Sequence, residues 1–155
     1  MRRIKPCLAG VDSDRADAFV RWRILALRGV GRRPGFVPRL SLVTCAEITQ
    51  ERHLPDDLVW WEPPDGRTRR VDVGLATEIA ARLLRDTGGE PVVAVWSRSG
   101  PNDEADSDLV WWAAIGQAAD IAGVRRPALL IITRDGWRCL PDGASRTWRR
   151  LRPTA

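Results

Sequence analysis

The chain contains no tyrosine, two phenylalanines and a single histidine, and its three cysteines, Cys7, Cys45 and Cys139, form no Cys-x-x-Cys pair. Disulfide frameworks need cysteines in even sets and cysteine-histidine zinc sites need them at close spacings, so we expect three reduced cysteines and no bound metal or cofactor. No apolar run approaches the roughly 20 residues of a membrane span, and no apolar leader follows the first residues. These absences predict a cytoplasmic protein without a membrane partner.

The common catalytic motifs are also missing. No Gly-x-Ser-x-Gly sequence marks a serine nucleophile, and Gly29-Val30-Gly31 lacks the remaining residues of a phosphate-binding loop. A two-metal nuclease can be sketched from Asp12, Glu62 and Asp135, because each acid lies near the end of an expected strand and carboxylates bind divalent ions. A metal-dependent hydrolase with an atypical site stays open as an alternative function. No catalytic residue is assigned, and whether the protein is an enzyme is left open, with a non-enzyme favoured.

What is present fits a folded domain. The chain has 155 residues, of which 44% are hydrophobic and 29% are charged. This length and composition predict one soluble globular domain over residues 1–155, with flexible ends at 1–10 and 152–155.

The net charge of +5 is unevenly distributed along the chain. Residues 1–40 carry ten basic and three acidic side chains, residues 41–110 seven and fourteen, and residues 111–155 eight and three. If the two basic ends converge on one face of the fold, they form a surface for DNA or RNA phosphates. That alternative rests on seven arginines: Arg2, Arg3, Arg32, Arg33, Arg149, Arg150 and Arg152.

Apolar periodicity predicts the elements of the fold. The expected helices span about 14–27, 73–86 and 106–122, and the expected strands lie at about 36–48, 58–61, 91–96, 128–133, 137–140 and 147–151, with a hairpin turn at 135–136. This order predicts an α/β fold, a single layered domain with a mixed β-sheet flanked by about three helices.

Tryptophan is unusually frequent, with eight copies in the chain. Because tryptophan often anchors protein interfaces, an exposed member of this set favours a protein partner or a homodimer. The candidates for such contacts are Trp60, Trp61, Trp111, Trp137 and Trp148.

A polar loop, Ser97-Arg98-Ser99-Gly100-Pro101, lies between the strands expected at 91–96 and 128–133, and Ser107 then opens a helix. Over about residues 70–140 this order resembles the JAB/MPN family of zinc isopeptidases, including its RadC-like branch. The resemblance implies a JAB/MPN-like fold with cytidine-deaminase-like layering. In that family two histidines of a His-x-His-Pro motif and the aspartate of a Ser-x-x-Asp motif bind zinc, and a distant glutamate is the general base.

The zinc ligands of that family are absent at the matching positions. With Trp96 as the aromatic residue before the motif, the histidine positions fall on Ser97 and Ser99, Ser107 matches the serine, and the aspartate falls on Val110.

A register one residue earlier places the histidines on Trp96 and Arg98, and a one-residue gap then makes Asp108 the aspartate. Glu47 or Glu62 corresponds to the general base, and the only histidine, His53, is far from the loop in sequence. The resemblance therefore implies a non-catalytic domain that works by protein association, through the loop at 97–105 and an exposed tryptophan.

Overall fold

A mixed six-stranded β-sheet forms the middle layer of the protein. The computed structural model describes residues 18–23, 38–44, 59–63, 71–100, 106–140, 143 and 145–147. The strand order is β2-β1-β3-β4-β5-β6; β3 and β4 are parallel, and every other neighbouring pair is antiparallel. The elements are β1 (Arg39–Thr44), β2 (Val59–Trp61), α3 (Val73–Asp86), β3 (Val92–Ser97), α4 (Asp106–Ala122), β4 (Leu129–Thr133), β5 (Gly136–Leu140) and β6 (Ser145–Thr147).

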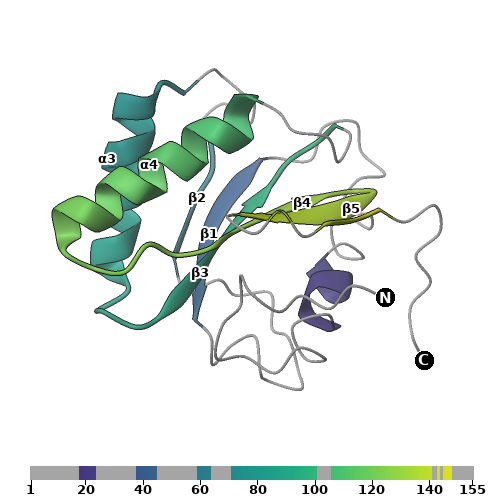
Figure 1. Ribbon diagram of the computed structural model, residues 1–155, viewed down its shortest axis with the longest axis horizontal. Helices are drawn as coiled ribbons and strands as arrows, with labels where there is room; N and C mark the ends of the chain where they lie inside the picture. The colour runs from purple at the N-terminus through teal and green to yellow at the C-terminus, as the bar shows by residue number, and fades with distance from the viewer. Residues whose placement is uncertain are drawn as a thin grey trace.

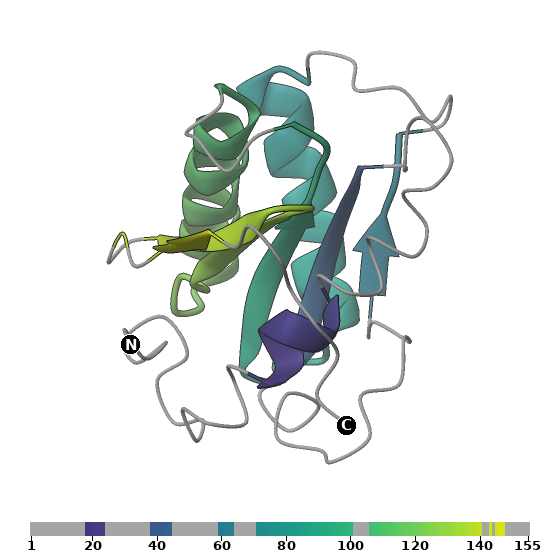
Figure 2. The same cartoon turned by 90° about the vertical axis from the view of Figure 1, so that its right-hand side faces the viewer.

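Helices α3 and α4 lie side by side on one face of the sheet (Figure 1). The helical segment at 18–23 lies on the opposite face, so the molecule has three layers (Figure 2). The predicted fold class, a single layered α/β domain with a mixed sheet and three helices, is confirmed.

Alternation along the strands builds the core beneath α3 and α4. Side chains on a strand point to opposite faces in turn, and directly paired residues share a face. Leu40, Ala94 and Trp96 therefore point towards the helices together with Leu129 and Ile131. They meet the buried side of α3 and the small residues of α4, which form one core cluster with them.

Helix α3 forms where the periodicity predicts it. The carboxylate of Asp72 caps its first turn by accepting a 2.8 Å hydrogen bond from the Leu75 amide. After the helix ends, Gly88 and Gly89 take φ values of 65° and 84°, a region that side chains disfavour, and the chain turns back into β3.

Helix α4 is packed along most of its length, and Gly116 allows the side chain of Arg126 to lie close to the helix backbone. A Cβ at Gly116 would lie 2.7 Å from Cζ of Arg126. This guanidinium stacks 3.5 Å from the ring centroid of Trp112 and donates a hydrogen bond to the Trp112 carbonyl. The segment after α4 is thereby held against the helix.

Most expected elements are present, with shifted ends. The predicted helix 73–86 is confirmed. A hairpin joins β4 to β5 as expected, but its turn lies at 134–135, one residue before the expected position, and Gly136 is already paired with Thr133. The last strand was expected at 147–151, whereas β6 begins earlier, at Ser145, because its pairing with β5 fixes its register. No helix in the described ranges is both long enough and apolar enough to cross a membrane.

One expectation about the cysteines is wrong. Cys139 is fully buried on β5, but it is disulfide-bonded rather than reduced. Cys7 and Cys45 lie outside the described residues. The spacing of three cysteines in sequence contains no signal for this bond, because the fold decides which sulfur atoms meet.

Candidate functional site

The sheet separates the candidate site residues into two sets. Trp96 points towards α3 and α4, and two residues later Arg98 points the same way, while Ser97 between them belongs to the other face. The Arg98 amide still bonds to the Ile132 carbonyl, so the ladder between β3 and β4 continues to this residue. Of the two registers considered, only the one on Trp96 and Arg98 faces α4.

Asp108 lies in the first turn of α4 and is completely buried, with a relative exposure of 0%. Its two carboxylate oxygens accept hydrogen bonds from Arg98, from Nε at 2.7 Å and from Nη2 at 2.9 Å. This is the fork-to-fork geometry in which arginine binds a carboxylate most strongly. The positive end of the α4 dipole further favours a negative charge in this turn.

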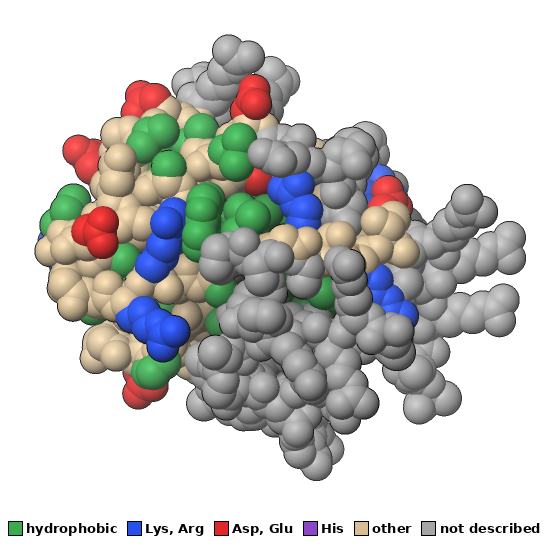
Figure 3. Space-filling model, viewed as in Figure 1, with side chains coloured by type: hydrophobic (Ala, Val, Ile, Leu, Met, Phe, Trp, Pro, Cys, Tyr) green, Lys and Arg blue, Asp and Glu red, His purple; other side chains and the backbone are tan. Residues whose placement is uncertain are grey.

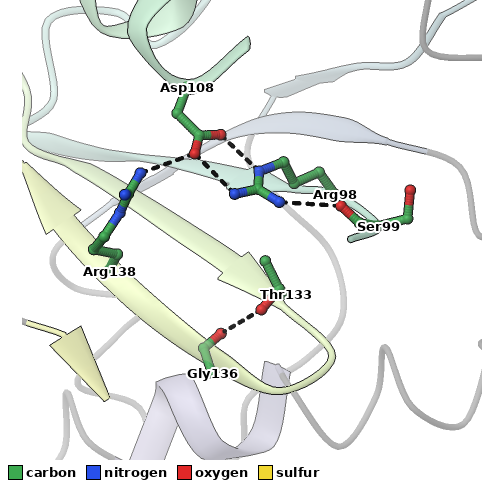
Figure 4. Close-up of polar contacts among 6 residues, drawn as sticks. All are labelled: Arg98, Ser99, Asp108, Thr133, Gly136 and Arg138. Atoms are coloured by element: carbon green, nitrogen blue, oxygen red, sulfur yellow. Dashed lines mark hydrogen bonds and ion pairs between the residues drawn. The ribbon is translucent and has the colours of Figure 1, made fainter. Parts of the chain in front are cut away.

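A second guanidinium reaches the same carboxylate. Nη2 of Arg138, on β5, donates a 2.8 Å hydrogen bond to Oδ2 of Asp108, and Figure 4 shows Asp108 between the two arginines. We call Arg98, Asp108 and Arg138 the ion triad. It joins the end of β3, the start of α4 and the middle of β5, three elements that are distant in sequence.

The triad also holds the start of the polar loop. Nη1 of Arg98 donates to the Ser99 carbonyl at 3.1 Å, and the Ser99 side chain lies on the far side of Arg98 from Asp108 (Figure 4). Gly100 then takes a φ of 93°, a backbone conformation that side chains disfavour. Ser97 is buried, Ser99 is exposed and Ser107 is half-buried at the start of α4.

The general-base candidate Glu62 is paired with a different arginine. Its Oε1 accepts hydrogen bonds from Nε and Nη2 of Arg39, at 2.8 and 2.6 Å. Arg39 alternates with Leu40, so it points away from the face that carries the ion triad. Glu62 is therefore bound on the other side of the sheet from Asp108.

These placements do not form a metal site. No group of three or more His, Cys, Asp or Glu side chains within the described ranges is arranged to hold a metal ion. Of the two-metal sketch, Asp12 lies outside the described residues, and the strands that precede the other two acids are separated: β2, before Glu62, is three strand spacings from β4, before Asp135, or about 14 Å. Two-metal catalysis needs ions about 4 Å apart.

The tryptophan candidates divide by burial. Trp111 and Trp137 are fully buried, which makes them core residues and corrects their assignment as contact residues. Trp61 is half-buried, and its ring centroid lies 5.5 Å from that of Trp111. Trp60 alone among the described candidates is exposed, at 50%, and the Arg39 guanidinium lies 4.4 Å from its ring centroid.

Sequence reasoning missed Arg138. Its signal was present in the hairpin. The turn expected at 135–136 would pair Thr133 with Arg138, and the observed turn pairs Ile131 with Arg138. Because residues 131 and 133 share a face of β4, both registers place the arginine on the helix-facing side of β5. Because Asp108 is buried, its negative charge needs a positively charged partner such as this arginine.

Several candidates lie outside the described residues: Glu47, His53, Asp12, Trp148 and the arginines at 2, 3, 32, 33, 149, 150 and 152. On the face shown in Figure 3, acidic and basic side chains of the described residues are interspersed over α3 and α4. The described side chains over these two helices therefore form no continuous positive surface of the kind that binds nucleic acid.

Compared with protein-family models, with curated proteins and with solved structures, the chain has no significant match.

Proposed function

We propose that the protein is a non-catalytic, JAB/MPN-like interaction domain in which an ion triad stands where a zinc-binding site would be. The supporting observation is the pairing of Arg98 with Asp108. In the register that faces α4, these residues match the second histidine and the aspartate of the zinc motif. Here the guanidinium binds both oxygens of the carboxylate.

The chemistry of this pairing argues against a metal-bound water at the same place. A zinc ion needs lone pairs from its ligands, and arginine has donors but no acceptor. Both oxygens of Asp108 already accept guanidinium hydrogen bonds, and the carboxylate has no exposed surface. Glu62, the described candidate for a base, is likewise bound by Arg39. A positive side chain therefore supplies the charge that a metal ion supplies in the zinc peptidases.

Metal analysis tests this proposal. The protein is incubated with zinc, dialysed and analysed for metal, beside an Asp108→Asn variant. We expect substoichiometric zinc in both proteins. Stoichiometric zinc in the wild-type protein that disappears in Asp108→Asn would contradict the proposal and restore a hydrolase.

The contact surface that we propose for this domain is centred on Trp60 at the edge strand β2. Arg39 stacks on its ring, and Glu62 holds Arg39 in turn, so the half-exposed indole is fixed before any partner arrives. Preorganised aromatic side chains lose little entropy on binding and dominate interface energies. A second copy of the chain is the first partner to examine.

Sedimentation equilibrium measures that association. Trp60→Ala is expected to weaken self-association by about 2 kcal/mol, or roughly 30-fold. Leu75→Ala is the matched control, because Leu75 is similarly exposed but lies on α3. Equal dissociation constants for wild type and Trp60→Ala would remove Trp60 from the interface.

A further inference from the structure

Arg138 uses only a small part of its hydrogen-bonding capacity. An arginine side chain has five N–H donors. Among the described residues, Arg138 donates one hydrogen bond, to Asp108, and its Nε is buried with no acceptor. The side chain is 15% exposed, so part of it reaches the surface.

The ion triad does not need this second arginine for charge balance. Arg98 already binds both oxygens of Asp108, and one guanidinium compensates one carboxylate. Arg138 therefore brings a further positive charge to the carboxylate. A buried N–H without an acceptor loses its hydrogen bonds to water without replacement, and such groups in native structures call for an explanation.

The neighbourhood of Arg138 offers further donors. Ser145 on β6 is paired directly with Arg138, so the two side chains lie on the same face of the sheet, and Ser145 is exposed. The first turn of α4 lies against Arg138 through the bond to Asp108, and backbone N–H groups at a helix start attract anions.

From these observations we propose that Arg138 is the central group of an oxyanion-binding site between β5, β6 and the start of α4. The ligand class is a phosphate group, either free or as a phosphomonoester. A planar guanidinium with free donors binds phosphate oxygens in a fork, and a dianion balances the surplus charge. The site does not depend on the proposed non-catalytic function, since it uses neither the loop at 97–105 nor Trp60.

Calorimetric titration with inorganic phosphate tests the site, in a chloride buffer of matched ionic strength. Arg138→Met removes the guanidinium but keeps an apolar stem, while Arg98 still holds Asp108. We expect Arg138→Met to bind phosphate roughly 10- to 100-fold more weakly than wild type, the equivalent of a charge-assisted hydrogen bond. Arg82→Met, at an exposed position on α3, is the control and is expected to bind as wild type does.

A second variant keeps the test decisive if Arg138→Met does not fold. Ser145→Asp places a carboxylate directly across from Arg138, where it fills the proposed site. We expect this variant to melt at the same or a higher temperature than wild type and to lose phosphate binding.

Three results would overturn the proposal: a wild-type protein that does not bind phosphate, an Arg138→Met variant with wild-type affinity, or a Ser145→Asp variant with wild-type affinity. Titration with acetate separates the two oxyanion chemistries. Tighter binding of acetate than of phosphate would replace the phosphate group by a carboxylate and so contradict the stated ligand class.

Discussion

Replacing Asp108 by asparagine removes the one negative charge between Arg98 and Arg138 without changing the size of the side chain. The asparagine oxygen can accept from one guanidinium, but its amide group points donors at the other. The variant therefore loses charge compensation at a position with no exposed surface, and at least one of the three hydrogen bonds of the ion triad.

The expected cost follows from this burial. Breaking a buried ion pair by removing one partner costs about 3–5 kcal/mol, because the remaining charge stays buried. A domain of this size has a total stability of about 5–15 kcal/mol, and each kcal/mol shifts its melting temperature by about 2–4 °C. We therefore expect Asp108→Asn to melt roughly 6–20 °C below wild type, measured by circular dichroism and by urea denaturation.

The control for this variant is Asp106→Asn. Asp106 is in the same first turn of α4 but is exposed, so its removal should cost about 1 kcal/mol or less, through the helix dipole alone. If Asp108→Asn unfolds within about 1 kcal/mol of wild type, the ion triad is not a stabilising element and the reasoning from its burial fails.

Three other predictions test the packing. Gly116→Ala places a methyl group where the Arg126 guanidinium lies, so the substitution should displace the guanidinium from Trp112 and lower the melting temperature. In an Arg126→Ala background the same Gly116→Ala substitution should raise the melting temperature, because alanine is a better helix former than glycine. Asp72→Ala removes the cap of α3 and should cost about 0.5–2 kcal/mol in urea denaturation, and full stability would show that the cap is replaced by water. Thiol titration of the denatured, unreduced protein should find one free cysteine, since Cys139 is disulfide-bonded and the chain has three cysteines; three free thiols would contradict the bond.

Local pattern was sufficient for most of the fold. The spacing of apolar residues in 73–86 predicted α3, and the turn at 135–136 predicted the β4–β5 hairpin. These signals work because helix and strand periodicities depend on neighbours within a few residues. The bounds of the last strand, β6, were less well predicted, because its position depends on pairing with β5 rather than on its own composition.

The candidate site was only partly predictable. Sequence reasoning singled out Arg98 and Asp108 as positions of a degenerate metal site, but it did not foresee that they bind each other. It placed Ser97 and Ser99 at the centre of the site, and strand alternation sends Ser97 to the other face. Trp111 and Trp137 were contact candidates and are core residues.

The sequence by itself determined the class of fold, the main elements and the absence of histidines from the loop that follows β3. Only the tertiary structure decided which charges meet, because Arg138 is 30 residues from Asp108 and they come together through the register of β5 on β4. Burial then sets the strength of this interaction. In water the same three side chains would interact weakly, whereas beneath α4 an unpaired carboxylate would be energetically costly, so Asp108 must be paired.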